Sequence, residues 1–357
     1  MSNNEFLKGR GAQLNVSNKF EAQQHEFRDD FLNYCASEGD EVENNKTVLI
    51  DTFPKTIVNK VTSPDVGMEF SLNPYQGCEH GCVYCYARNS HEYWGYSAGL
   101  DFERKILVKR NAVELLEKKL RSKKWDAKPI ILSGNTDCYQ PIEKKLRITR
   151  QLLETFLKYK HPVGIITKNA LVQRDMDILR ELAADKLVKV TLSVTSLSED
   201  TRRILEPRTA SIKKRLETIE KLSAANIPVS VMMAPIIPAI NSHEIMPLVK
   251  EISQRGALSV GYTIVRLNGA IAEIFTNWIK QTMPDRADKV LRQIESLHGG
   301  SLNDSRFGTR MKGEGEFASQ VAQQFKLARN KFLKDRERTN LNCKLHESFK
   351  DGQMKLF

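Results

Sequence analysis

The sequence contains no apolar run that approaches the roughly eighteen residues needed to span a membrane. Its first residues, 1–5, have neither the basic start nor the apolar stretch of a signal peptide. Cysteine is also scarce outside one short stretch, because only Cys35, Cys138 and Cys343 stand apart from the other three. Widely separated thiols are typical of proteins in a reducing compartment. These absences predict a cytoplasmic protein that makes no membrane contact.

Acidic side chains are fewer than basic ones, 44 against 55, which gives a formal net charge of +11. The basic residues gather mostly on expected helices, where a solvated helix face is the usual explanation. No sequence motif of an RNA- or DNA-binding module is present. The charge therefore permits a polyanionic substrate such as nucleic acid without requiring one.

Three cysteines, Cys78, Cys82 and Cys85, fall within eight residues with the spacing C-x3-C-x2-C. Three thiols cannot pair as disulfides without leaving one over, and the stretch lacks the paired C-x2-C knuckles of a four-ligand zinc site. Three thiolates on a short glycine-containing loop suit a [4Fe–4S] cluster in which one iron has no protein ligand. That iron is open to a small molecule. A zinc site with His80 or His91 as its fourth ligand is the alternative.

The cysteine spacing, with an aromatic residue directly before the third cysteine, resembles the signature of the radical SAM superfamily. The wider string N-P-Y-x-G-C-x-H-G-C-x-Y-C-Y-A-R, residues 73–88, resembles a narrower group, the bacterial proteins grouped with spore photoproduct lyase. The resemblance implies that the three cysteines hold three irons and that S-adenosylmethionine (SAM) chelates the fourth. It also implies that Tyr84 lies against the adenine, and that one electron from the cluster cleaves SAM to give a 5′-deoxyadenosyl radical.

Short apolar strands alternate with amphipathic helices over most of the chain. Strands are expected at 68–72, 129–132, 162–167, 188–194, 228–234 and 258–265, and helices at 110–122, 147–160, 175–183, 210–225, 244–254 and 270–281. Six such units with short connections predict an α/β fold with a parallel sheet and crossover helices. Six units fall short of the eight in a full barrel. The resemblance implies the same architecture, a partial (β/α)6 TIM-type barrel of the radical SAM type.

We expect three parts: a polar leader (1–45), the partial barrel (46–284) and a C-terminal helical extension (285–357) packed on the barrel. The leader is expected to be partly ordered, because its segment Gly9-Arg10-Gly11-Ala12 resembles the opening of the radical SAM relatives. Finer expectations are short strands at 47–50 and 55–61, helices at 21–32, 288–296 and 318–334, and a C-terminal end, 353–357, that docks on the protein.

In parallel barrels, functional side chains lie at the carboxyl ends of strands and in the loops that follow. Thr136 and Asp137 follow the second predicted strand, where radical SAM proteins hold the amino group of SAM; the G-G-E string often found there is missing, and a helix cap would use the same residue types. Lys168 follows the third strand and is predicted to pair with the SAM carboxylate. Ser193 ends the fourth strand, where the superfamily often contacts the ribose, although an ordinary strand-end hydroxyl is the alternative.

Two more residues are predicted to contact SAM. Arg208 lies in a Glu-Pro-Arg loop that resembles the group's pattern, and its guanidinium would brace a carboxylate, or else form an exposed ion pair. Ala234 ends the fifth predicted strand, where the superfamily's backbone and small side chains pass beside the adenine.

Cys138 is a candidate for the catalytic residue. Spore photoproduct lyase has a hydrogen-donating cysteine in this region, in a string like A-C-T-S-D. Aligned on the final Asp, that cysteine falls at Gly134 here. The donor is therefore missing from its expected place, and Cys138 would have to substitute from a neighbouring turn; a plain loop thiol is the alternative.

These features predict a radical SAM enzyme whose substrate the sequence does not reveal. The expected cofactors are a [4Fe–4S] cluster and SAM, and the expected partner is a reductant such as flavodoxin or ferredoxin. No second cysteine cluster is present, so we expect no auxiliary iron–sulfur centre. DNA lesion repair of the spore photoproduct lyase type is a second hypothesis. A zinc-stabilised nucleic-acid-binding protein is a third, from another class.

Overall fold

The computed structural model describes residues 6–20, 46–337 and 339–350. Its main sheet has the strand order β10-β9-β8-β7-β6-β3-β2. All neighbouring strands are parallel except β2, which runs antiparallel to β3. The α/β fold with a parallel sheet, predicted from the alternation, is confirmed. The strands are β2 (Val58–Lys60), β3 (Phe70–Leu72), β6 (Ile130–Leu132), β7 (Val163–Thr167), β8 (Val188–Ser193), β9 (Val229–Ile236) and β10 (Val260–Ile264).

One row of apolar side chains runs through the sheet and explains why these strands pair in this register. Leu72 lies opposite Leu132, Leu132 opposite Ile165, Ile165 opposite Val190, and Val190 opposite Val229. Each of these side chains is at most 1% exposed. A shift by one residue would move the whole row out of the core, so burial of this row fixes the register.

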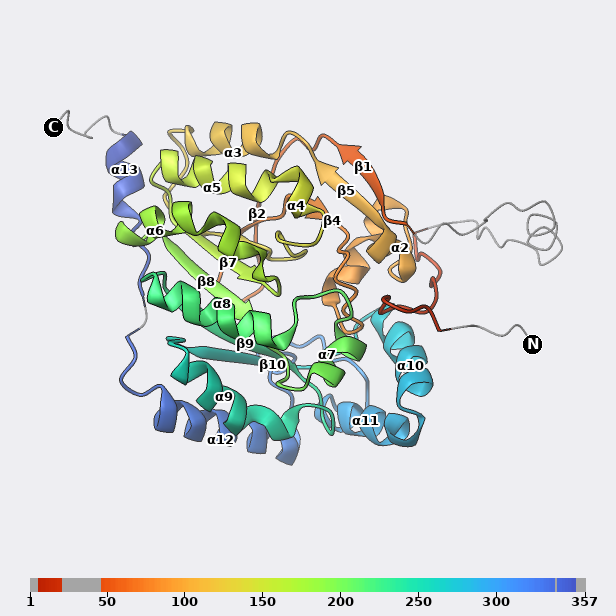
Figure 1. Ribbon diagram of the computed structural model, residues 1–357. Coiled ribbons are helices and arrows are strands. Elements are labelled where there is room, and N and C mark those ends of the chain that lie inside the picture. The colour runs from red at the N-terminus through yellow and green to blue at the C-terminus, as the bar shows by residue number, and fades with distance from the viewer. Residues whose placement is uncertain (1–5, 21–45, 338, 351–357) are drawn as a thin grey trace, which may run out of the picture.

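Amphipathic helices cover the outer side of the sheet, one after another along the chain (Figure 1). Most of their buried faces join the strands in one core, as with Leu152, Leu153 and Phe156 of α5. The last two helices before residue 300 pack instead in a second cluster with residues 82–84 of the cysteine stretch. The longer helices are α3 (Ala112–Leu120), α5 (Ile148–Lys158), α6 (Met176–Ala184), α8 (Ile212–Ala224), α9 (Ile245–Gln254), α10 (Ile271–Thr282), α11 (Pro284–Leu297) and α12 (Gly315–Phe332). The short ones are α2 (Leu100–Arg104), α4 (Glu143–Leu146), α7 (Glu199–Leu205) and α13 (Lys344–Lys350), with 3-10 turns η1 (Tyr86–Ser90), η2 (Glu92–Trp94), η3 (Ala170–Asp175) and η4 (Ser242–Glu244).

A second, small sheet supports the cysteine stretch. It has the order β1-β5-β4, with β1 (Val48–Thr52) parallel and β4 (Tyr75–Gln76) antiparallel to β5 (Lys105–Lys109). The sequence predicts two strands before the barrel, but β1 belongs to this separate sheet, and β2 is an edge strand of the main one. The strand β4 leads directly into the cysteine loop, so pairing with β5 fixes where the loop begins.

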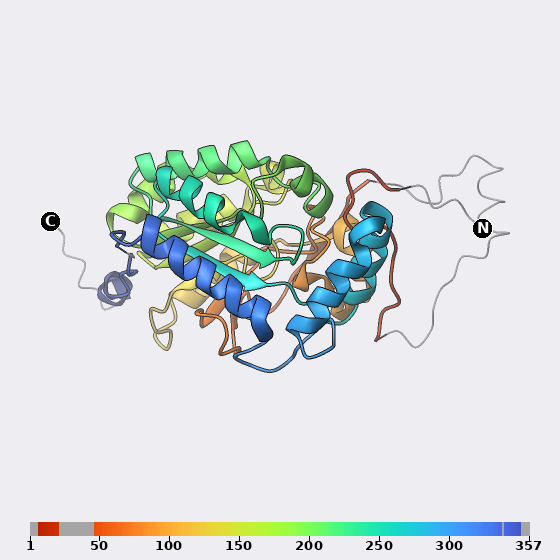
Figure 2. The same cartoon turned by 90° about the horizontal axis from the view of Figure 1, so that it is seen from below.

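The C-terminal segment packs on the main sheet. Figure 2 shows α12 beside α9 and β10. Phe325 of α12 is fully buried and stacks on Tyr262 of β10, with ring centroids 4.1 Å apart. Arg329 donates from Nη2 to the Val260 carbonyl at 2.9 Å. The predicted helices 288–296 and 318–334 correspond to α11 and α12.

Two expectations fall outside the residues that the structure describes, the helix at 21–32 and the docking of 353–357, and so does Cys35. No helix in the described ranges is both long and apolar enough to pass through a lipid bilayer.

Candidate active site

The cysteine loop, residues 77–85, connects β4 to η1 and is bonded to two other parts of the chain. Cys78 donates its backbone N–H to the Phe102 carbonyl at 2.8 Å, and Val83 donates to the Leu205 carbonyl at 3.1 Å. Gly81 has φ of 70°, and a Cβ there would lie 2.9 Å from the Glu103 carboxylate. The tight loop therefore requires glycine at this position.

A fully buried ion pair, Arg88 with Glu103, holds the far end of the loop. Arg88 donates from Nε to the Cys82 carbonyl at 3.0 Å and from Nη1 to the Gly99 carbonyl at 2.9 Å. Glu103 also accepts the backbone N–H of Ala12 at 2.8 Å. The N-terminal segment is thus bonded to the carboxylate that orients Arg88. Sequence reasoning missed Glu103, since nothing in its local pattern marks it.

The three cysteines carry free thiols on the same loop. Cys78 and Cys82 are each 7% exposed, and Cys85 is half-buried. Burial raises the pKa of Cys78 well above its usual value and that of Cys82 to about 12. A metal binds the thiolate form, so metal binding at Cys78 and Cys82 would be coupled to proton release.

Among the described residues, no three His, Cys, Asp or Glu side chains are grouped to hold one metal ion. His80 is bonded to Asp137 and Asn169. Burial lowers the pKa of His91 to about 4, and its ring packs edge-on against Phe102.

Lys168, directly after β7, lies beside this loop. Its ammonium is 5.9 Å from the centroid of the Tyr84 ring. Burial would lower its pKa, but Cys82, when its sulfur is a thiolate, and the Glu206 carboxylate raise it above the usual value, so the lysine stays charged. No residue that the structure describes forms a hydrogen bond or ion pair with this ammonium. The cation is therefore available to a carboxylate ligand.

A buried polar network lies beneath Tyr84. The Tyr84 phenol donates to the Glu206 carboxylate, which also accepts from Thr195 Oγ1 at 2.6 Å and pairs with Arg215 of α8. Burial would raise the pKa of Glu206, but Arg215 and Lys168 lower it to about 2. Arg215 donates in turn to the Ser193 carbonyl at 3.0 Å. This network fixes the Tyr84 ring, and sequence reasoning did not find its members Thr195, Glu206 and Arg215 as site residues.

Thr136 and Asp137 form their observed bonds within the protein. Thr136 donates from Oγ1 to the Tyr75 carbonyl at 2.6 Å. Asp137 accepts the Lys168 backbone N–H at 2.7 Å and Thr167 Oγ1 at 2.8 Å. Although burial opposes it, His80 and the backbone N–H groups of Lys168 and Tyr139 lower the pKa of Asp137. Both side chains therefore join the loop after β6 to neighbouring strands, and neither caps a helix.

The other predicted residues are divided between the site and its surroundings. Ser193, at the end of β8, is buried, and Ala234 is a half-buried residue of β9 whose carbonyl accepts from Thr195 Oγ1 at 3.4 Å. Arg208 pairs with Glu79 at 3.3 Å, through one nitrogen rather than bidentately.

The catalytic candidate Cys138 is fully buried in the main core. Tyr86, an exposed residue next to the loop, donates from its phenol to the Gly134 carbonyl at 2.6 Å. The aromatic residues on both sides of Cys85 could have drawn attention to Tyr86.

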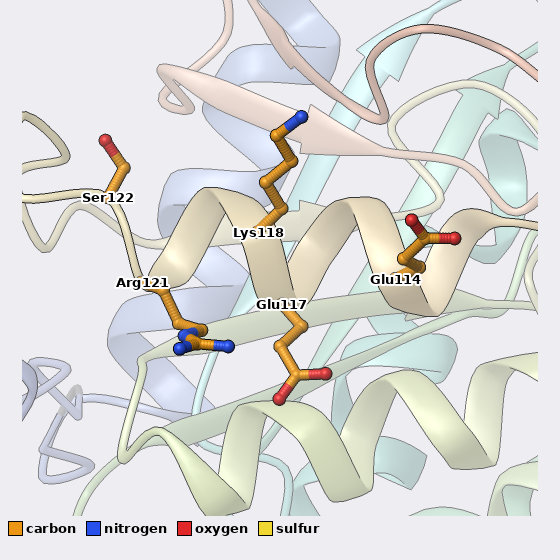
Figure 3. A pocket seen from close by; sticks show the side chains of 5 residues that line it. All are labelled: Glu114, Glu117, Lys118, Arg121 and Ser122. Carbon is orange, nitrogen blue, oxygen red and sulfur yellow. The ribbon is translucent and has the colours of Figure 1, made fainter.

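A hollow on the outer side of α3 has no part in this arrangement. Figure 3 shows its mixed charges, with Glu114, Glu117, Lys118 and Arg121 along one helix. Glu117 is already paired with Lys158 at 2.7 Å.

Comparison with known proteins shows which family the chain belongs to. The model of the radical SAM superfamily matches residues 72–252. An uncharacterized protein of Mycobacterium tuberculosis is 30% identical over 234 residues, 65% of this chain and 69% of that protein. An uncharacterized protein of Methanocaldococcus jannaschii is 27% identical over 242 residues, 68% of this chain and 86% of that protein.

Solved structures of spore photoproduct lyase share the fold. The enzyme complexed with dinucleoside spore photoproduct has a TM-score of 0.58 at 18% identity, with 81% of each chain covered. A mutant with bound AdoMet and the same dinucleoside has a TM-score of 0.57 at 15% identity, covering 85% of this chain and 91% of that one.

Replacing Glu206 with Gln should destabilise the protein by about 3 kcal/mol at neutral pH, because Arg215 would keep a buried charge without its partner. The folded-state pKa of about 2 lies below the unfolded value of about 4.3. The charged carboxylate therefore stabilises the fold above pH 4, and this contribution is lost as the pH falls towards 2. Urea unfolding at several pH values measures the gap, which is the difference in unfolding free energy between the wild type and the variant.

The exposed Glu316→Gln is the matched control and should change the unfolding free energy by less than about 0.5 kcal/mol. A gap between Glu206→Gln and wild type that stays constant from pH 7 to the lowest pH at which both fold would contradict the assigned ion pair.

Proposed function

Because the chain belongs to the radical SAM superfamily and is an enzyme that cleaves SAM, we propose that Cys78, Cys82 and Cys85 bind the [4Fe–4S] cluster at which this cleavage occurs. The observation that carries the proposal is one loop with three free thiols beside a lysine whose ammonium has no ion-pair partner in the part of the chain that the structure describes. A cluster bound by three thiolates is anionic, and Lys168 would offset part of that charge. When bound, the cluster and SAM supply the one-electron cleavage that yields methionine and a 5′-deoxyadenosyl radical.

The remaining residues would hold SAM in place. Lys168 would pair with its carboxylate, and the Tyr84 ring, fixed by Glu206, would lie against the adenine. Ser193 would approach the ribose, and Ala234, two residues before the end of β9, would leave room beside the base. We propose that Thr136 and Asp137 act indirectly, since their side chains position β4 and the Lys168 backbone. In the same way, Arg208 would brace the loop through Glu79 rather than contact SAM.

A cytoplasmic location and a low-potential protein reductant complete the proposal. The cluster chemistry needs one electron from outside for each SAM cleaved, and an oxygen-sensitive cluster is best preserved in a reducing compartment.

Replacing Cys85 with Ala should abolish both the cluster and SAM cleavage, because one iron would lose its protein ligand. The protein is reconstituted without oxygen, reduced with dithionite and given SAM, and iron, sulfide and 5′-deoxyadenosine are measured. Cys343→Ala, a half-buried cysteine outside the loop, is the control and should keep four irons per chain and full activity. A colourless wild type with about one zinc per chain would favour the zinc-stabilised alternative instead.

Replacing Lys168 with Met should weaken SAM binding roughly tenfold or more, because a charge-assisted hydrogen bond to the carboxylate is lost. The cluster should remain, so iron content stays unchanged. Equilibrium dialysis of the reconstituted protein with labelled SAM measures the affinity. Lys189→Met, an exposed lysine of β8, is the control. Unchanged SAM affinity in Lys168→Met would exclude the predicted contact.

DNA lesion repair is the second candidate, supported by the fold shared with spore photoproduct lyase and by the net charge of +11. Against it, Cys138 is enclosed in the core and Gly134 occupies the donor position. Repair predicts tighter binding of UV-irradiated than of intact duplex DNA, which filter binding at about 0.15 M salt measures. Equal affinity for the two DNAs would count against this candidate.

A further inference from the structure

An open groove on the outer side of the cysteine loop is lined by four cationic side chains and no acidic one. They are Lys144, Arg202, Arg208 and Lys214, which come from α4, α7, the loop before α8, and α8 itself. We call it the basic groove. It lies on the connections that follow β6, β7 and β8, so three separate segments of sequence line it, and its cations come from the first and the third.

The basic groove contacts the loop between the first two cysteines. Arg208 donates its backbone N–H to the His80 carbonyl at 3.2 Å, and its side chain pairs with Glu79. Asn169, another lining residue, contacts the His80 ring at 3.3 Å. A Cβ on Gly81 would lie 3.2 Å from the Pro207 ring. A molecule in the groove would therefore be separated from the cysteines by a single layer of residues.

The charges in the groove are only partly neutralised. Arg202 pairs with Glu199, and Arg208 pairs with Glu79. Lys144 and Lys214 are exposed, and neither ammonium has a hydrogen-bond or ion-pair partner among the residues that the structure describes. Two solvated cations thus face outward at the rim, where they attract anionic partners from a distance.

We propose that the basic groove is the docking surface for an acidic one-electron carrier protein that supplies the electron for SAM cleavage. The inference rests on the proposed function, which requires such an electron. The carrier would be oxidised by one electron, and that electron would be consumed in breaking one carbon–sulfur bond of SAM. Lys168 and Tyr84, which would contact SAM, do not line the groove, so carrier and SAM would use different surfaces of the same loop.

An acidic protein fits the groove better than nucleic acid does. Surfaces for single strands combine positive charge with aromatic side chains on which bases stack, and no aromatic residue lines the groove. Contact with the cysteine loop also has a purpose for an electron carrier, which must approach the cluster closely. Complementary charge at the rim would speed this encounter and make it sensitive to salt.

The test reverses both free charges in Lys144→Glu/Lys214→Glu. Binding of an acidic flavodoxin to the reconstituted enzyme is measured by calorimetry, and 5′-deoxyadenosine formation is driven by either flavodoxin hydroquinone or dithionite. We expect the flavodoxin Kd at about 50 mM salt to rise roughly tenfold, and the difference from wild type to shrink near 0.5 M salt. Iron content and the dithionite-driven rate should not change.

Lys118→Glu/Lys326→Glu is the matched control, with the same charge change at exposed positions on α3 and α12 (Figure 3 for Lys118), and it should bind flavodoxin like the wild type. Equal flavodoxin binding by wild type and the groove variant would overturn the docking proposal. So would a groove variant that loses only DNA affinity. A wild type that forms no 5′-deoxyadenosine with dithionite would instead refute the proposed function, and the docking role with it.

Discussion

The fully buried pairing of Arg88 with Glu103 is the constraint on which the candidate site depends. Removing two charges from water costs several kcal/mol for each ion, so the pair is stable only if both groups are well bonded. The protein meets this condition with backbone groups: Arg88 donates to carbonyls that include that of Cys82, and Glu103 accepts from Ala12. The cost of burial is thus offset by joining the cysteine loop, α2 and the N-terminal segment into one unit. A loop held this way keeps its thiols in place before any metal binds.

A second buried ion pair, Glu206 with Arg215, sets the charge of the groups around Tyr84 and Lys168. The Glu206 carboxylate stays ionised because Arg215 lies against it, and that negative charge helps to keep Lys168 protonated. The protein thus stabilises a cation near Cys82 and Cys85 that has no ion-pair partner among the described residues. A free cation at this place suits a ligand that brings its own carboxylate, as SAM does.

The sequence predicted what depends on local pattern. Strand–helix alternation predicted the parallel sheet, because each strand buries an apolar row such as that through Ile165, and the cysteine spacing predicted the loop. It could not predict contacts between distant residues. Glu103 lies fifteen positions from Arg88, and β5 pairs with β1 more than fifty positions away, so no periodicity signals either. Thr136 resembled a ligand because strand ends carry both ligands and caps, and only the structure shows its hydroxyl bonded to Tyr75. Cys138 resembled a loop thiol, yet the core covers it completely.

The proposed chemistry has two requirements, SAM binding and electron delivery, and the charged residues around the loop assign them to different surfaces. In the proposed function SAM would reach the open iron where its carboxylate meets a cation, and Lys168, near Tyr84, would supply that cation. The electron must arrive without the carrier blocking SAM or substrate, and the basic groove reaches the loop at Glu79, His80 and Gly81 through Arg208, Asn169 and Pro207. Both surfaces are built on connections that follow parallel strands, where one edge of the sheet gathers residues from distant parts of the chain. One short loop between β4 and η1 can therefore serve both, because each approaches it through different residues.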